Sequence, residues 1–247
     1  MSRLLSLYRS TLGKKAIVAV TGVAMLVFLV LHVIGNLKAF LPDPQLGVPD
    51  IDVYSRYLRS MGTPLLPHGA ALWAIRIVML VALALHVVCV VKLARINHAA
   101  RPIRYHRRRF VEATTAARSM LVTGAILLAF LGFHLLQFTT GTIDSERFVE
   151  GAVYANLYRA FHEVSIFAIG YVLAMGILAT HVYHGAWSLF QSLGYDRPDR
   201  NPGLRAFALL LALGLFVTFS SVPVAFFSGK MPVPPDSKRV AAVKGGG

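Results

Sequence analysis

Residues 16–35 read AIVAVTGVAMLVFLVLHVIG, a run of 20 residues with no charged side chain and one histidine, His32. A helix needs about 20 mostly apolar residues to cross the hydrocarbon of a bilayer. This stretch is therefore long enough to span a membrane. No small-x-small cleavage site follows it before Gly35 and Asn36, so it does not read as a cleavable signal peptide.

Four further stretches of the same kind follow along the chain. They cover residues 70–91, 119–138, 164–191 and 206–229, and the segments between them are rich in Pro, Gly and Arg, as loops are. The composition agrees, because 56% of the 247 residues are hydrophobic and only 15% are charged, against about 25% charged residues in an ordinary soluble domain. We therefore predict an all-α membrane protein with five transmembrane helices.

The basic residues predict the orientation of these helices. If the N-terminus is inside, the inner segments hold 15 basic and three acidic residues, and the outer segments hold 10 and eight when Arg76, in the outer part of its span, is counted with them. Basic residues favour the cytoplasmic side, so we expect a cytoplasmic N-terminus and an external C-terminus. The net charge of +14 is therefore assigned to the membrane surface and not to nucleic acid. The basic run 101–109 is either a lipid-facing loop or a docking site for a soluble partner.

Three parts of the chain follow from this pattern. Residues 1–15 are expected to be a cytoplasmic interfacial segment, because Leu4, Leu5 and Leu7 lie there beside Arg3 and Arg9. Residues 16–229 form the five-helix domain, and residues 230–247 are expected to be a flexible tail outside. The single cysteine, Cys89, excludes an internal disulfide and any four-cysteine metal site built by this chain alone.

Each of the first four spans has a histidine inside its apolar run. These residues are His32, His86, His134 and His181, and the fourth span also contains His184 nearer its end. A lone membrane histidine is more often a packing residue, but ionisable groups in the hydrocarbon are costly and mark functional sites. Four of them, one on each helix, favour a role as ligands.

The depth of the four histidines divides them into two pairs. His32 and His134 lie 16 and 15 residues into helices that run outward, so both are in the outer half of the membrane. His86 and His181 lie near the inner ends of helices that run inward. We call these the outer pair and the inner pair. The two layers differ by roughly ten residues, or about 15 Å of helix.

An internal repeat supports the same division. The pattern Thr21-Gly22-x-x-x-Leu26-x-Phe28-Leu29-x-x-His32 recurs as Thr123-Gly124-x-x-x-Leu128-x-Phe130-Leu131-x-x-His134, and Leu83-Ala84-x-His86-Val87 recurs as Leu178-Ala179-x-His181-Val182. The first span is thus equivalent to the third, and the second to the fourth.

Two imidazoles at one depth suit a cofactor with two axial positions, and haem b is such a cofactor. Facing helices of a four-helix bundle build sites of this type. Zinc fits poorly, because each layer offers two nitrogens and no thiolate or carboxylate. Glycines can make room for flat macrocycles, although they also allow close helix packing; they are Gly22, Gly124, Gly132, Gly170 and Gly176. We predict that the first four helices form a di-haem bundle.

Two other residues are candidates for the cofactor site. His184 competes with His181 as a ligand, but the repeat and the depth favour His181, which leaves His184 nearer the cytoplasmic edge beside a haem propionate. Arg76 is the one charged residue within the spans and lies ten residues outward of His86. It either pairs with a propionate of the outer haem or extends toward the interface.

The chain resembles a known family over about residues 10–229. The resemblance is carried by Gly13-Lys14-Lys15, Thr21-Gly22, His32-x-x-Gly35-Asn36-Leu37-Lys38, Tyr57-Leu58-Arg59, Leu72-Trp73-x-x-Arg76, His86-Val87, Ala100-Arg101-Pro102-x-x-Tyr105, Phe133-His134-Leu135-x-x-Phe138-Thr139-x-Gly141 and His181-x-x-His184-Gly185-x-Trp187-Ser188-x-Phe190-Gln191-x-Leu193-Gly194. These strings are similar to the single-chain, five-helix, di-haem cytochrome b558 anchor of succinate:menaquinone oxidoreductases and quinol:fumarate reductases.

The resemblance implies a subunit of an oxidoreductase complex in the bacterial cytoplasmic membrane. It implies that a flavoprotein and an iron–sulfur subunit bind at the cytoplasmic face, and that electrons from succinate pass through an inner and an outer haem to menaquinone. His86 and His181 would ligate the inner haem, and His32 and His134 the outer one. Succinate chemistry would lie on the partner chains.

Several alternatives stay open at this point. The same subunit could serve a quinol:fumarate reductase, and the histidines could instead form a proton relay of a transporter or pack in a haem-free anchor. A transporter is less expected, because the spans contain no acid and the repeat is not inverted. Candidate quinone residues near the outer pair are Tyr54, Arg56, Arg59 and His68.

Overall fold

The computed structural model describes residues 10–43, 47–99, 115–143, 145–192 and 201–234. All regular elements in these residues are helical. They are α2 (Thr11–Leu37), η1 (Lys38–Phe40), α3 (Asp50–Ser60), α4 (Ala70–Ala99), α5 (Thr115–Phe138), α6 (Val153–Tyr158), η2 (Arg159–Glu163), α7 (Ser165–Ser192) and α8 (Asn201–Phe227). Most of the expected interfacial segment, the basic run 101–109 and most of the tail lie outside the described residues.

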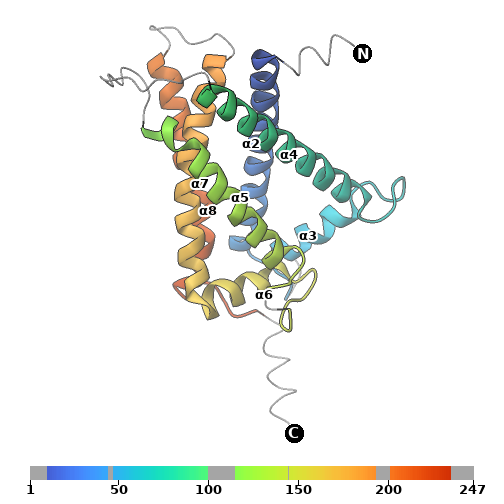
Figure 1. The fold of residues 1–247 in the computed structure, drawn as a ribbon. Coiled ribbons are helices and arrows are strands. Elements are labelled where there is room, and N and C mark those ends of the chain that lie inside the picture. Colours follow the sequence, from blue (N-terminus) through green and yellow to red (C-terminus); the bar gives the residue numbers. More distant parts are fainter. Residues whose placement is uncertain (1–9, 44–46, 100–114, 144, 193–200, 235–247) are drawn as a thin grey trace.

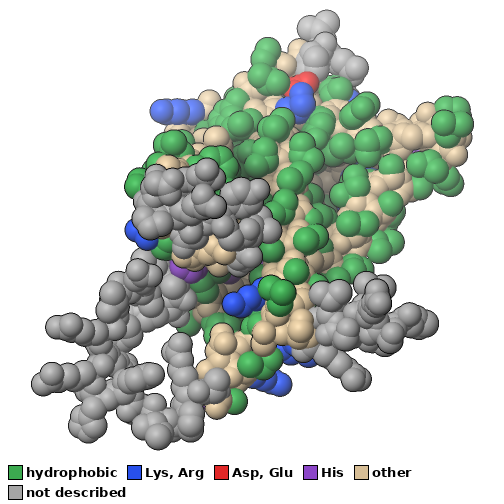
Figure 2. Space-filling model, turned by 90° about the horizontal axis from the view of Figure 1, so that it is seen from above, with side chains coloured by type: hydrophobic (Ala, Val, Ile, Leu, Met, Phe, Trp, Pro, Cys, Tyr) green, Lys and Arg blue, Asp and Glu red, His purple; other side chains and the backbone are tan. Residues whose placement is uncertain are grey.

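Five of these helices, α2, α4, α5, α7 and α8, are long and apolar enough to cross a membrane. The prediction of five apolar spans is therefore confirmed. Large apolar side chains on them point outward, and Val20 and Leu210 are each 70% exposed. Figure 2 shows hydrophobic side chains over most of the described surface in that view, with Lys and Arg at a few separate places. Such an apolar exterior suits contact with lipid.

The helices extend beyond the predicted spans at several ends. α2 begins at Thr11 because the Ser10 side chain caps it and accepts a hydrogen bond from the backbone N–H of Gly13. α4 continues past residue 91 to Ala99, whereas α7 begins at Ser165, one residue after the predicted start, because Val164 has a non-helical backbone. Apolar runs mark the part of a helix that meets hydrocarbon, whereas caps decide where the hydrogen-bonded helix begins.

The long helices alternate in direction, as Figure 1 shows. One end of the molecule, here called the amino-terminal face, contains the start of α2, and the opposite end, the α3 face, contains α3 and α6. α2 packs against α4, α5 against α7, and α7 along α8. The two halves of the internal repeat are thus two helix pairs, α2 with α4 and α5 with α7.

The fifth long helix, α8, holds much of the packing core although it has no histidine. Ala208, Leu215, Phe219 and Phe226 of α8 are buried against its neighbours. Pro223 lies inside the helix without ending it. α8 contacts α7 over much of its length and also contacts α2. It therefore joins the two repeat halves, which the sequence pattern of the first four spans does not indicate.

Short elements close the α3 face. The side chain of Asp52 on α3 accepts a hydrogen bond from the backbone N–H of Tyr154 on α6 at 2.9 Å. Lys38 and Asp50 form an ion pair at 2.8 Å that joins η1 to α3. The Asp52–Tyr154 contact thus joins the loops of the two repeat halves, and the Lys38–Asp50 pair holds the first of these loops together.

Candidate functional site

The outer pair is in direct contact in the structure. The ring centroids of His32 on α2 and His134 on α5 are 6.0 Å apart, and the ring planes are nearly perpendicular, at 86°. Phe28 stacks on His32 at 5.4 Å, and Phe219 of α8 lies 5.9 Å from it. The two imidazoles thus meet across the two repeat halves, enclosed by aromatic rings.

The inner pair is held by two equivalent contacts. Thr21 Oγ1 on α2 lies 3.1 Å from His86 Nδ1 on α4, and Thr123 Oγ1 on α5 lies 3.1 Å from His181 Nδ1 on α7. The distance and the atoms are the same in both halves.

A glycine next to each threonine faces the same imidazole. A Cβ added at Gly22 would lie 3.6 Å from His86 Cε1, and one added at Gly124 would lie 3.4 Å from His181 Cε1. The other expected glycines behave differently. Nothing lies within 4 Å of a Cβ at Gly132 or Gly170, and one at Gly176 would face Phe216 of α8.

The contacts set the separation of the two layers. His86 lies beside Thr21 and Gly22, and Gly22 precedes His32 by ten residues on α2. His181 lies beside Thr123, which precedes His134 by 11 residues on α5. At 1.5 Å per residue the layers are about 15 Å apart.

Two polar residues that the sequence did not single out support the outer pair. His134 Nδ1 lies 3.1 Å from the hydroxyl of Tyr171, and this hydroxyl donates to Gln137 Oε1 at 2.8 Å. Gln137 is 6% exposed. The signal for both was present, because Gln137 follows His134 by three residues on the same helix face, and Tyr171 precedes His181 by ten.

Arg76 on α4 matches Tyr171 on α7 in the internal repeat. Arg76 precedes His86 by ten residues, and Tyr171 precedes His181 by the same number. Its guanidinium lies 5.0 Å from the ring centre of Trp73. Among the described residues it has no ion-pair partner. Arg76 thus lies on α4, the helix that packs against the one that carries His32.

His184 lies one helical turn beyond His181 on α7 and close enough to interact with it electrostatically. Its Nδ1 is buried and has no hydrogen-bond partner among the described residues, and the same is true of Trp187 Nε1. The two rings meet edge to face at 6.2 Å, and Arg205 of α8 stacks on Trp187 at 4.1 Å. These polar groups could receive an anionic group at the amino-terminal face.

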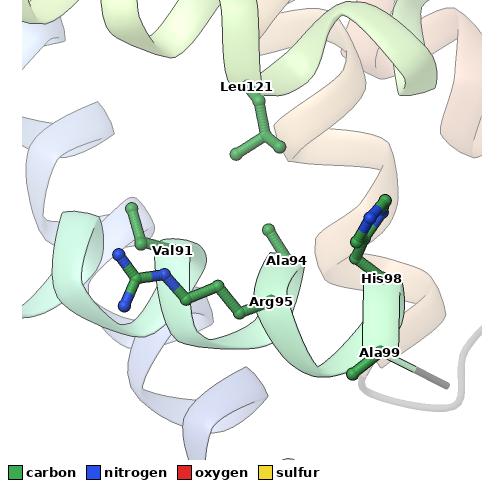
Figure 3. Close-up of a pocket in the computed structure, with 6 residues that line it drawn as sticks. All are labelled: Val91, Ala94, Arg95, His98, Ala99 and Leu121. Atoms are coloured by element: carbon green, nitrogen blue, oxygen red, sulfur yellow. The ribbon is translucent and has the colours of Figure 1, made fainter.

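A cavity of about 490 Å³ opens between α4 and α5 near the amino-terminal face. Figure 3 shows its lining, in which Arg95 and His98 are the polar members beside Val91, Ala94, Ala99 and Leu121. It lies one to three helical turns beyond His86 on α4. α4 and α5 therefore leave space between them on the side of the inner pair.

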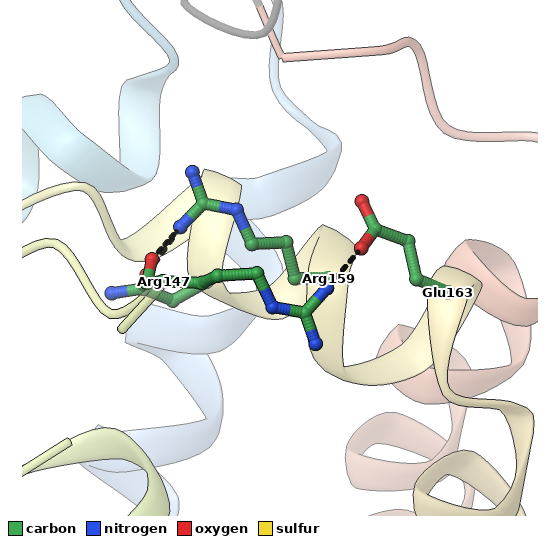
Figure 4. Close-up of polar contacts among 4 residues, drawn as sticks. Arg147, Arg159 and Glu163 are labelled. Carbon is green, nitrogen blue, oxygen red and sulfur yellow. Dashed lines mark hydrogen bonds and ion pairs between the residues drawn. The ribbon is translucent and has the colours of Figure 1, made fainter. Parts of the chain in front are cut away.

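The α3 face contains a polar cluster, shown in Figure 4. Arg147 pairs with Glu163 at 3.1 Å, and the Arg159 side chain donates to the backbone carbonyl of Arg147. A cavity of about 30 Å³ beside Gln137 reaches this cluster, which is room for about one or two waters.

The expected quinone residues lie apart from that cavity. Tyr54 packs its ring against Gly35, and Lys38 lies 5.5 Å from the centre of the same ring. Arg59 forms an ion pair with Glu150 at 3.6 Å. Tyr54, Arg56 and Arg59 belong to α3, and His68 lies in the loop that follows it.

The donor set indicates which metal chemistry is possible. The described residues contain no group of three or more His, Cys, Asp or Glu side chains that could hold a metal ion. Each layer offers two imidazoles. A metal held at the outer pair would take one nitrogen from His32 and one from His134. The remaining ligands would have to come from a macrocycle.

Comparisons with models of protein families, with curated proteins and with solved structures find no match to this chain.

Proposed function

We propose that this chain is the membrane anchor and electron-transfer subunit of a bacterial succinate:menaquinone oxidoreductase. In this proposal the amino-terminal face is cytoplasmic and binds a flavoprotein and an iron–sulfur subunit. The inner pair and the outer pair each hold one haem b, in a bundle of α2, α4, α5 and α7. Haem held at the two layers would supply one-electron transfer between the iron–sulfur subunit and menaquinone.

The observation that carries the proposal is the two-layer arrangement of histidines. Each layer takes one imidazole from each repeat half, and the two layers are about 15 Å apart along the helices. Haem b held by two histidines would supply one-electron transfer and would leave no vacant site for oxygen. Two such groups in series would connect the two faces of a membrane.

The chain's own residues fit this role. Phe28 and Phe219 pack around His32 and exclude water from the outer pair. Gly22 and Gly124 have no side chain, which leaves space beside the imidazoles of the inner pair. Arg76 offers a cation to a carboxylate at the outer layer, and Trp187 with His184 offers hydrogen-bonding groups at the inner one. Both are places where a propionate would be stabilised.

An absorption spectrum tests the haem part of the proposal. The purified full-length chain, oxidised and then reduced with dithionite, is expected to show a sharp b-type α-band and about two haems per chain. A chain that folds without any haem band would contradict the proposal and favour a packing or proton-relay role for the histidines.

Single substitutions test the pairing. We expect His32→Ala and His134→Ala to remove the outer haem, and His86→Ala and His181→Ala to remove the inner haem. His68→Ala, in a loop outside both pairs, is the control and is expected to keep both haems. If His32→Ala and His86→Ala deplete the same haem, the pairing is wrong.

The assignment to a succinate-oxidising complex has its own test. Co-purification of the chain is expected to yield a flavoprotein and an iron–sulfur protein with succinate-dependent quinone reduction. The chain separated from them is expected to keep its haem and to show no succinate-dependent dye reduction. Activity of the separated chain would refute the assignment.

A further inference from the structure

The hydroxyl of Thr21 can play only one role toward His86. It donates its single hydrogen to the carbonyl of Ile17 at 2.7 Å, and a hydroxyl has no second hydrogen to give. Toward His86 Nδ1, at 3.1 Å, it therefore acts as the acceptor. His86 thus carries its proton on Nδ1, which leaves the lone pair on Nε2.

The second repeat half has the same arrangement. Thr123 Oγ1 donates to the carbonyl of Ser119 at 3.1 Å and contacts His181 Nδ1 at 3.1 Å. The hydroxyl again accepts from Nδ1–H, and Nε2 of His181 keeps its lone pair.

Tyr171 repeats this logic at the outer layer with a different side chain. Its hydroxyl donates to Gln137 Oε1 at 2.8 Å, and its oxygen lies 3.1 Å from His134 Nδ1. The hydroxyl hydrogen of Tyr171 is already donated to Gln137 Oε1, so the hydroxyl oxygen accepts a hydrogen bond from Nδ1–H of His134. Three of the four histidines are therefore held in the same tautomer by a hydroxyl that is itself anchored.

We infer that Thr21, Thr123 and Tyr171 are positioning residues that fix the tautomer and the ring orientation of His86, His181 and His134 for axial ligation through Nε2. This inference rests on the proposed function. The Thr–Gly dipeptide of the repeat acts as a unit, since the hydroxyl holds Nδ1 and the adjacent glycine receives the Cε1 edge of the same ring. Partners of this kind orient metal-bound histidines and raise their basicity.

His32 differs from the other three histidines. It has no hydrogen-bond partner among the described residues, and aromatic rings pack around it. The position of α4 that matches Tyr171 is Arg76, whose guanidinium has only donors and cannot accept from an imidazole N–H. The inner layer thus has two anchored imidazoles and the outer layer has one.

A threonine hydroxyl that bonds its own helix is common in apolar helices and has no functional meaning by itself. Thr180 is such a residue, because its Oγ1 donates to the carbonyl of Ile177 and it is exposed. It directly precedes His181 in the chain and contacts no histidine ring through its hydroxyl. It is therefore the matched control for Thr21 and Thr123.

The test is a potentiometric titration of the full-length haem-loaded chain that resolves both haems, with electron paramagnetic resonance of the oxidised form. Loss of the Nδ1–H acceptor makes an imidazole less basic, which destabilises the oxidised iron and raises the midpoint potential. Thr21→Val and Thr123→Val are expected to raise the potential of the inner haem alone, and Tyr171→Phe that of the outer haem alone. Haem affinity should fall by about ten- to a hundredfold. Thr21→Ser and Thr123→Ser should restore wild-type values.

Each outcome decides the inference. Unchanged potentials and spectra in Thr21→Val, Thr123→Val and Tyr171→Phe, with haem retained, would overturn it and leave the proposed function standing. If Thr21→Val loses the inner haem, retention in Thr21→Ser and Thr180→Val supports the role of the hydroxyl, whereas equal loss in Thr21→Ser overturns it. A wild-type chain without haem would refute the proposed function itself, which is a separate result.

Discussion

Tyr171→Phe is expected to destabilise the fold even in the absence of any cofactor. The substitution keeps the aromatic ring, which packs against Phe130 at 4.9 Å and Phe161 at 5.0 Å. It removes one oxygen that takes part in two interhelical contacts, to His134 at 3.1 Å and Gln137 at 2.8 Å. The effect is therefore a hydrogen-bonding effect and not a packing effect.

The magnitude follows from the number of bonds and their surroundings. Interhelical hydrogen bonds in membrane proteins contribute about 0.6 kcal/mol on average and up to about 1.7 kcal/mol. Two bonds give a loss of about 1–3 kcal/mol in the free energy of unfolding. Gln137→Leu should cost less in the Tyr171→Phe background than alone, because the buried amide has then already lost its donor. The expected coupling energy between Tyr171 and Gln137 is about 0.6–1.7 kcal/mol.

The assay is a double-mutant cycle on the free energy of unfolding in detergent micelles. Tyr183→Phe is the control, because it removes a hydroxyl from the same helix that makes none of these contacts, and it is expected to change stability by less than about 0.5 kcal/mol. Strictly additive effects of Tyr171→Phe and Gln137→Leu would refute the reasoning, since the hydroxyl and the amide would then not interact.

Three further predictions follow from other contacts. Arg76→Gln is expected to lower the midpoint potential of the outer haem more than that of the inner haem, because a fixed positive charge favours the reduced form, and Arg76→Lys should do less; an unmoved outer potential in a redox titration would show that the guanidinium serves the interface. Gly35→Ala is expected to lower the Tm through overpacking of about 1–3 kcal/mol, since its Cβ would lie 2.8 Å from the ring of Tyr54, whereas Gly170→Ala has open space and should not; equal Tm values for the two variants would contradict this. Burial, together with Asp43 and Tyr158, raises the pKa of Tyr154 to about 12, so its contribution to stability is full below its usual pKa of about 10 and is lost as the pH rises toward 12; unfolding of Tyr154→Phe measured against pH should lack this loss, and an identical pH profile would speak against it.

The sequence alone predicted the five apolar helices, and the structure confirms them. This was possible because crossing hydrocarbon demands a local property, an unbroken apolar run, that can be read without any knowledge of neighbours. The position of each histidine within its apolar run likewise predicted two layers about 15 Å apart from helical rise alone. The helix ends were less predictable, because they depend on caps such as Ser10.

Only the tertiary structure decided which side chains support the histidines. Thr21 was visible in the repeat, but its partner His86 lies 65 residues away on another helix, and Tyr171 reaches across from α7 to α5. The central position of α8 was equally absent from the pattern, since an apolar helix reads the same whether it faces lipid or protein. Hydropathy specifies that a helix enters the membrane, whereas the rotation and neighbours of that helix are set by side-chain packing and interhelical hydrogen bonds, which involve residues far apart in the chain.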